Sequence, residues 1–204
     1  MYICPMGRNA HIPAADTQKF IIEKTSVLFN KKGYASTSLS DLEKVTGLTK
    51  GSIYANFKDK EDVSLKVFDY NFAQLSKAMS QKVYSETTVK GKLLACINFY
   101  LDFYPTLVTN GGCAVQNALI ETDDTNTHLF ERAKDALISW KQTMTAIVKQ
   151  GIANNEISNS VMPDDFAVYM IALIEGAILV SRSLNDYSAF KYILNRLKKE
   201  IELL

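Results

Sequence analysis

The segment from Phe29 to Lys60 constrains the fold most, because helix breaks and capping residues follow one another there at short, fixed intervals. Gly33 can end one helix, since glycine enters the left-handed conformation without a Cβ clash. Gly47 falls where a tight turn must join two short helices, about Leu39–Thr46 and about Lys50–Phe57. Two short helices joined by such a turn form a helix-turn-helix, whose second helix enters the major groove of DNA.

Side chains able to cap a helix N-terminus stand before each of the next three expected helices. Ser38 and Asp41 have capping-box spacing, with Asp in place of the usual Glu or Gln. Thr49 can cap the second short helix through its side-chain oxygen. Asp59 can cap a long helix that begins near Lys60 and continues into the rest of the chain. No Pro- or Gly-rich linker follows, so the segment and the remaining body are expected to move as coupled parts.

This pattern resembles the DNA-binding domain of the tetracycline-repressor (TetR) family. The resemblance implies an all-α protein with an N-terminal three-helix DNA-binding head, placed at residues 14–60, and a larger helical body for ligand binding and dimerisation at residues 61–204. Beyond the motif, the chain matches the family only in length and helical character. The motif residues that carry the resemblance are Phe29, Gly33, Tyr34, Thr37, Ser38, Asp41, Leu42, Gly47, Leu48, Lys50, Gly51, Ser52, Ile53, Tyr54, Phe57 and Lys60.

The second short helix supplies the predicted base contacts, since the resemblance implies that its exposed positions face the groove. Lysine suits guanine and asparagine suits adenine, and a glycine at the helix start allows close approach to DNA. Phosphate contacts are expected from hydroxyl and lysine side chains near helix N-termini, where exposed N–H groups favour anions. The alternative is an ordinary exposed helix with a solvated lysine. The predicted DNA-binding residues are Thr37, Ser38, Lys50, Gly51, Ser52, Tyr54, Asn56 and Lys60.

Composition permits this fold without proving the function. The chain has 204 residues, of which 47% are hydrophobic, and its four prolines and nine glycines argue against a loop-rich or all-β protein. The net charge of +1 is a weak signal for nucleic acid, so the motif carries that prediction. Met1–Pro13 lacks the apolar stretch of a secretory signal, and the three cysteines do not form a disulfide or zinc pattern. We therefore expect a cytoplasmic protein with no metal site and no cofactor.

The C-terminal half contains an almost continuously apolar run, Phe166–Val180, interrupted by Glu175. It is shorter than the roughly 18–20 residues needed to span a membrane, so a buried helix at a dimer interface is the better interpretation. Ala172 and Gly176 would let two helices approach closely, and the family forms its four-helix dimer interface from the last two helices of each subunit. The predicted homodimer contacts are Phe166, Met170, Ala172, Leu173, Gly176, Leu179, Tyr192 and Leu197.

Aromatic residues along the body helices can form either plain core or the wall of a ligand cavity. Family members of this size usually hold a pocket between these helices, and apolar walls with a few polar groups are the usual form of small-molecule sites. The upstream body helix is expected to span Val89–Tyr104 and to end before Pro105. The predicted ligand-binding residues are Phe68, Phe72, Phe99, Tyr100, Phe103, Cys113, Asn117, Trp140, Met144 and Tyr169.

These observations predict a homodimeric transcriptional regulator that a small hydrophobic or aromatic ligand releases from a near-palindromic operator. An enzyme is not expected, since no nucleophile–base pair, phosphate loop or metal cluster is evident. One alternative is a thiol-based electrophile or oxidant sensor that uses Cys113, whose place at a helix start can lower a thiol pKa, although free cysteines are usually buried hydrophobes. Another is an activator or partner-binding regulator that has no small-molecule pocket.

Overall fold

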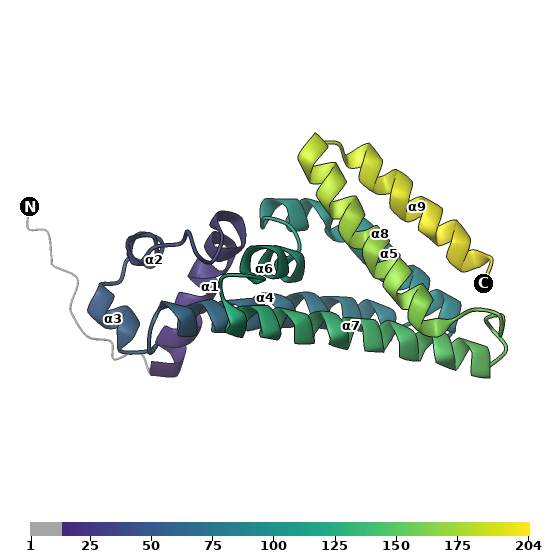
Figure 1. The fold of residues 1–204 in the computed structure, drawn as a ribbon, viewed down its shortest axis with the longest axis horizontal. Helices are drawn as coiled ribbons and strands as arrows, with labels where there is room; N and C mark the ends of the chain where they lie inside the picture. Colours follow the sequence, from purple (N-terminus) through teal and green to yellow (C-terminus); the bar gives the residue numbers. More distant parts are fainter. Residues whose placement is uncertain (1–13) are drawn as a thin grey trace, which may run out of the picture.

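The computed structural model describes residues 14–204, and the described part consists of nine α-helices without a strand. The expectations for Met1–Pro13 lie outside the described residues. Three helices form one end of an elongated molecule, and the last two lie at the opposite end (Figure 1). The helices are α1 (Ala14–Lys32), α2 (Leu39–Thr46), α3 (Lys50–Tyr54), α4 (Lys60–Val83), α5 (Val89–Thr109), α6 (Ala114–Thr122), α7 (Thr127–Ala153), α8 (Pro163–Leu184) and α9 (Tyr187–Glu202).

The predicted caps set the boundaries of α2, α3 and α4. The Ser38 side chain accepts from the Asp41 N–H while the Asp41 carboxylate accepts from the Ser38 N–H, which completes the capping box of α2. Gly47 ends α2 in the left-handed conformation at φ 71°. Thr49 and Asp59 cap α3 and α4 as expected. Helix α3 ends at Tyr54 rather than near residue 57, so it is shorter than predicted.

Helix α4 connects the two ends of the molecule. It packs against α1 near its start and against α5, α6 and α7 along its length. In Figure 1 it runs beside α7 through the middle of the molecule. A movement of α4 would therefore displace α1 at one end of the molecule and the helices of the body along its length.

Helix α5 continues through Pro105 to Thr109, which corrects the prediction that it ends at Tyr104. Proline has no N–H to donate to the carbonyl of Leu101, four residues earlier. That carbonyl instead accepts from the hydroxyl of Tyr187 at 3.2 Å. Tyr104 stacks on Tyr187 and also contacts Phe190, with ring centroids 4.6 Å and 4.4 Å apart. Contacts from α9 therefore stabilise a helix that local sequence would end.

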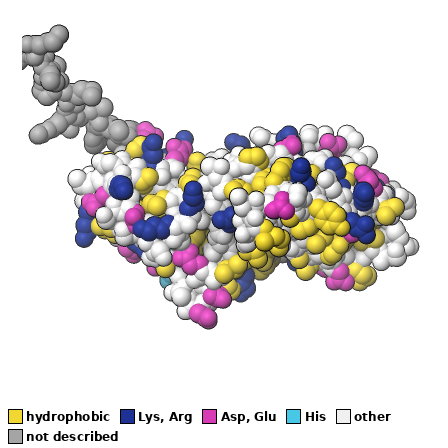
Figure 2. Space-filling view, turned by 90° about the horizontal axis from the view of Figure 1, so that it is seen from above, with side chains coloured by type: hydrophobic (Ala, Val, Ile, Leu, Met, Phe, Trp, Pro, Cys, Tyr) yellow, Lys and Arg dark blue, Asp and Glu magenta, His cyan; other side chains and the backbone are white. Residues whose placement is uncertain are grey.

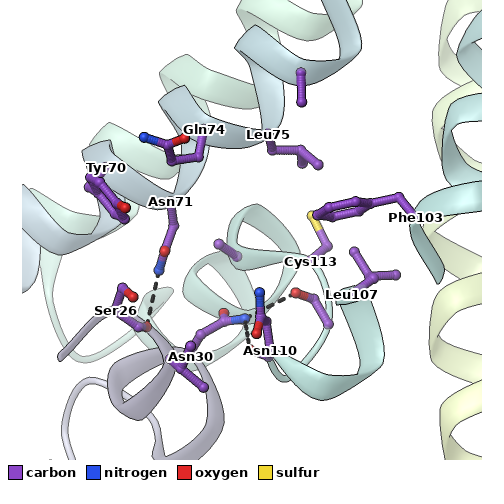
Figure 3. Close-up of a pocket in the computed structure, with 14 residues that line it drawn as sticks. Ser26, Asn30, Tyr70, Asn71, Gln74, Leu75, Phe103, Leu107, Asn110 and Cys113 are labelled. Carbon is purple, nitrogen blue, oxygen red and sulfur yellow. Dashed lines mark hydrogen bonds between the residues drawn. The ribbon is translucent and has the colours of Figure 1, made fainter. Parts of the chain in front are cut away.

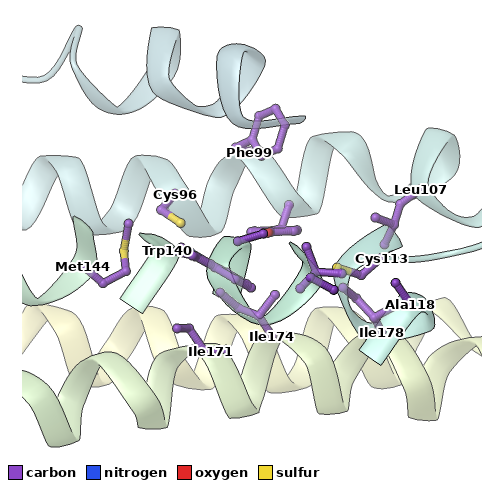
Figure 4. Packing of buried hydrophobic residues seen from close by; sticks show 14 of the residues in the cluster. Cys96, Phe99, Leu107, Cys113, Ala118, Trp140, Met144, Ile171, Ile174 and Ile178 are labelled. Carbon is purple, nitrogen blue, oxygen red and sulfur yellow. The ribbon is translucent and has the colours of Figure 1, made fainter. Parts of the chain in front are cut away.

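The body core lies between α5, α7 and α8, where Trp140 and Met144 of α7 lie near Ile171 and Ile174 of α8, and Ile178 lies near Ala118 of α6 (Figure 4). Among the described helices, α8 is the one long and apolar enough to cross a membrane by length and composition. It packs closely against both α7 and α9, and part of its surface forms this core.

Candidate nucleic-acid interface and ligand cavity

The start of α3 presents an exposed edge at one end of the molecule, formed by Lys50, Gly51 and Ser52. The Lys50 N–H donates to the Glu43 carboxylate at 2.7 Å, which ties α3 to α2. The Lys50 ammonium has no carboxylate partner among the residues the structure describes. It is thus available to an external acceptor such as a base edge or a phosphate.

Tyr54 and Asn56, at the end of α3, are only half-exposed. The Asn56 side-chain amide donates to the Ser52 carbonyl at 2.9 Å, and the Asn56 carbonyl accepts from the Gln18 side chain at 2.9 Å. Asn56 therefore helps to join α3 to α1, and one N–H of its side-chain amide is engaged within its own turn, which leaves the second N–H and the amide oxygen for a base. Tyr54 packs partly against the hydrophobic core.

The predicted phosphate contacts divide into exposed and buried groups. Ser38 is exposed, and Lys60 donates from Nζ to the Ala35 carbonyl at 2.8 Å. Thr37 is fully buried, and its hydroxyl donates to the Gly33 carbonyl at 2.6 Å. The predicted contact between the Thr37 side chain and phosphate is therefore wrong, because that side chain closes the turn after α1.

Glu121 of α6 forms hydrogen bonds with the turn between α1 and α2. The two carboxylate oxygens of Glu121 accept from the N–H groups of Tyr34 and Ala35 at 2.9 Å and 2.8 Å. These bonds hold the turn between α1 and α2, directly after Gly33, whose missing side chain leaves room for the carboxylate. This contact has no local signal in the sequence, because its partners lie more than 80 residues apart in the chain.

A second contact joins α1 to the turn between α5 and α6. The Asn30 side chain donates to the carbonyls of Asn110 and Gly112 at 2.6 Å and 3.0 Å (Figure 3). Asn117 of α6 donates to the Asn30 side-chain oxygen at 3.0 Å and to the Gly111 carbonyl at 2.9 Å. A Cβ on Gly111 would lie 2.9 Å from the Asn30 carbonyl, so this approach requires glycine. Asn117 was predicted to orient a ligand, but its amide is engaged in this junction.

Two neighbouring cavities open between the helices of the body. The first, of about 310 Å³, lies between α1, α4 and the end of α5, with Tyr70 and Phe103 in its wall (Figure 3). The second, of about 250 Å³, lies between α4, α5 and α7, with Tyr100 and Trp140 in its wall. Leu75 and Cys113 line both cavities. Cys113 directly precedes α6. Helix α6, whose Glu121 is hydrogen-bonded to the turn between α1 and α2, therefore begins at the cavity wall.

Apart from Asn117, the predicted ligand-binding residues fall into three groups in the structure. Those that line a cavity are Phe72, Tyr100, Phe103, Cys113 and Trp140. Phe68, Phe99 and Met144 are buried and line neither described cavity, so they are core residues. Tyr169 is 42% exposed on α8 and its hydroxyl donates to Glu200 at 2.7 Å. Its prediction as a ligand contact is wrong, because it lines neither described cavity and is bonded to α9 at the surface.

Cys113 is buried, and burial raises the pKa of its thiol well above the ordinary value. The expectation that the helix start lowers this pKa is wrong, because loss of solvation outweighs the favourable bonds from the Val115 and Gln116 N–H groups. A buried neutral thiol is a poor nucleophile. The structure therefore argues against Cys113 as an electrophile or oxidant sensor.

Glu175 is a polar group of the body that the sequence analysis noticed only as an interruption of the apolar run. Both of its carboxylate oxygens are buried and have no hydrogen-bond partner within the described residues. Burial raises the pKa of this carboxyl to about 7. The Trp140 indole N–H is likewise buried and without a partner in the described part of the chain.

The comparisons with known proteins agree with this architecture. The family described as "Bacterial regulatory proteins, tetR family" matches residues 21–67, and "Tetracyclin repressor-like, C-terminal domain" matches residues 90–197, which is more than half of the chain. The chain belongs to the TetR family. As a TetR-family protein it is a DNA-binding transcriptional regulator and not an enzyme, in agreement with the sequence prediction.

Two similar solved structures cover almost the whole chain, and a similar repressor covers about four fifths of it. The TetR-family regulator from Cytophaga hutchinsonii is 39% identical, with a TM-score of 0.88 over 95% of this chain and 98% of that one. A TetR regulator from Chloroflexus aurantiacus J-10-FL is 31% identical, with a TM-score of 0.88 over 93% and 96% of the two chains. The transcriptional repressor DhaR of Mycobacterium sp. (strain GP1) is 23% identical over 162 residues, which are 79% of this chain and 80% of DhaR.

The predicted dimer contacts lie on α8 and α9. TetR-family regulators usually act as dimers. Met170 and Leu197 are fully buried within their own chain, so their prediction as dimer contacts is wrong. Ala172 is exposed, and Leu179 and Tyr192 are 52% and 74% exposed. Figure 2 shows apolar side chains gathered on the half of the molecule that carries these helices. The remaining predicted contacts, Phe166, Leu173 and Gly176, are partly exposed.

Proposed function

We propose that this TetR-family regulator is a homodimeric repressor that a small hydrophobic or aromatic ligand releases from a near-palindromic DNA operator. DNA binding is assigned to residues 14–60, and ligand binding and dimerisation to residues 61–204. The observation that carries the proposal is the position of α6, which begins at the cavity wall with Cys113 and is bonded to the DNA-binding end through Glu121.

The exposed start of α3 supports the DNA-binding part of the proposal. Lys50, Gly51 and Ser52 are exposed together, and the Lys50 ammonium has no carboxylate partner among the described residues. Ser38 adds an exposed hydroxyl at the start of α2, where helix N–H groups favour a phosphate. In a dimer, two such ends would lie in successive major grooves of one operator.

The contacts of α6 support release by a ligand. A ligand can shift the equilibrium between DNA-bound and released forms only if it binds the two forms with different affinity. A ligand that widens the cavity at Leu75 and Cys113 would displace α4 and the start of α6 together. Glu121 and Asn117 would carry this displacement to the turn after α1 and to Asn30. The orientation of α3 would then change relative to the operator.

The apolar outer face of α8 and α9 supports the homodimer. Leu179 and Tyr192 are largely exposed, although side chains of this size usually avoid water when several lie together. Ala172 and Gly176 leave room for a partner helix, since no atom lies within 4 Å of the position of a Cβ on Gly176. A second copy of the same face would cover this surface with closed two-fold symmetry.

The test combines ligand binding with operator release. Trp140 is the sole tryptophan of the chain and lines the second cavity, so its fluorescence reports occupancy directly. Compounds that change this fluorescence should raise the dissociation constant of the operator complex, while compounds that leave it unchanged should not. Ligands that fill the cavity without any change in operator affinity would contradict the proposed release.

A further inference from the structure

Glu175 stands out as a buried carboxylate without a partner in the middle of α8. Its helix neighbours toward the core, Ile171, Ile174 and Ile178, are apolar. Within the described residues no ion pair and no hydrogen bond of good geometry meets its oxygens, and the Cys113 thiol, a weak donor, lies close enough to lower the pKa of the carboxyl slightly against the effect of burial. Buried carboxylates are normally paired, because loss of hydration without compensation is costly. A single weak thiol donor does not compensate a buried carboxylate, so the position of Glu175 is not explained by folding alone.

Glu175 lines neither described cavity, but its carboxylate lies beside the thiol of Cys113, which lines both. It is close enough to the Cys113 thiol and the Tyr100 hydroxyl to contribute, after burial, to the raised pKa of both groups. Cys113 and Tyr100 both line the second cavity. Gln116 of α6 also donates to the Glu175 backbone carbonyl at 3.3 Å, which fixes this part of α8 against α6.

The cavity wall in front of Glu175 suits an organic cation. Phe72, Leu75 and Met79 supply apolar surface, and Tyr100 and Trp140 supply aromatic faces with ring centroids 6.1 Å apart. Aromatic faces attract ammonium groups, most strongly where water is excluded. A carboxylate in a region of low dielectric attracts a positive charge over several ångströms, so one small side chain between them does not remove the effect.

We propose that the ligand is a cationic amphiphile, an apolar aromatic or aliphatic amine whose ammonium group lies beside Tyr100 and Trp140 and is neutralised by Glu175. This inference rests on the proposed ligand-released function and names the ligand class of that cavity. Neutral compounds of the same shape bind more weakly, and carboxylates are excluded, because a second negative charge would lie near Glu175.

Three probes with one carbon skeleton separate charge from shape: 4-phenylbutylamine, 4-phenylbutanol and 4-phenylbutanoate. Binding to the full-length protein is followed by the fluorescence of Trp140, and release is followed separately on an operator duplex. We expect the amine to bind most tightly and the carboxylate least. In Glu175→Gln the affinity for the amine should fall by on the order of tenfold or more, while the affinity for the alcohol stays within about twofold.

The matched control is Glu202→Gln, which removes the same charge from an exposed position on α9. It should leave the order of the three probes unchanged, and thermal unfolding should show that both variants are folded. Equal affinities of wild type and Glu175→Gln for the amine would overturn the inference, while release by the alcohol would leave the proposed function intact. Absence of binding and release by all three probes would count against the inference and the ligand-released function together.

Discussion

Replacement of Glu121 by alanine tests the contact that joins α6 to the DNA-binding end. The carboxylate accepts two backbone bonds, from Tyr34 at 2.9 Å and Ala35 at 2.8 Å. Hydrogen bonds to charged groups contribute about 1.5–3 kcal/mol each. The Ala35 N–H is exposed and water can replace its partner, whereas the Tyr34 N–H is partly buried. We therefore expect Glu121→Ala to lower the free energy of unfolding by about 2 kcal/mol.

Two measurements check this magnitude at equal protomer concentration, because dimerisation makes stability concentration-dependent. Urea unfolding should show the loss of about 2 kcal/mol, and hydrogen exchange at the Tyr34 amide should accelerate by about 30-fold. Glu131→Ala is the control, since Glu131 forms an exposed ion pair with Lys134 on α7 and should contribute less than about 1 kcal/mol. Unchanged stability and unchanged exchange at Tyr34 would refute the assigned role of Glu121.

Three further predictions follow from single side chains. Lys50→Ala should raise the operator dissociation constant by about 5- to 30-fold, as expected for loss of about 1–2 kcal/mol, whereas Lys149→Ala on α7 should not, by fluorescence anisotropy. Because the Glu175 pKa of about 7 exceeds its ordinary value of 4.5, the folded state binds the proton more tightly. The free energy of unfolding should therefore fall by about 2.5 kcal/mol between about pH 5 and about pH 8 in wild type but not in Glu175→Gln. The neighbouring Tyr100 and Cys113 stay neutral over this range because burial raises the pKa of both, so a slope that persists in the variant would assign the effect elsewhere. Iodoacetamide should alkylate Cys113 more slowly in the native than in the urea-unfolded chain, by mass spectrometry, and faster native labelling would restore the thiol-sensor hypothesis.

The features that sequence predicted well depend on neighbours within a few residues. The caps formed by Ser38, Thr49 and Asp59, and the left-handed Gly47, each need only a partner three or four positions away. Such motifs can be recognised in a sequence because backbone geometry fixes the number of residues between a capping side chain and its partner. The helix-turn-helix was therefore predictable almost to its boundaries.

The errors arose where distant residues decide the structure. Helix α5 passes through Pro105 because Tyr187, more than 80 residues later, supplies the missing bond to Leu101. The phase of α8 separates buried Met170 from exposed Ala172, two positions apart, and the apolar run contained no polar pattern that revealed it.

The ligand cavity was predictable only as a region. Aromatic side chains such as Phe99 and Tyr100 are adjacent in sequence, yet one packs into the core and the other faces a cavity. This choice depends on how three helices meet, which helical periodicity does not encode. The sequence did contain a signal at Glu175, because a carboxylate in an apolar run loses its hydration on burial and needs a compensating partner.

Binding of the purified protein to the DNA just upstream of its own gene, against a scrambled duplex and across a salt series, tests the central claim most directly. The account predicts tight binding to the upstream DNA alone, with log K falling linearly with log salt by about 0.9 for each phosphate contacted. Lys50→Ala should weaken that complex without dissociating the dimer. Equally weak binding to both duplexes, unaffected by the substitution, would contradict operator recognition at this site by α3.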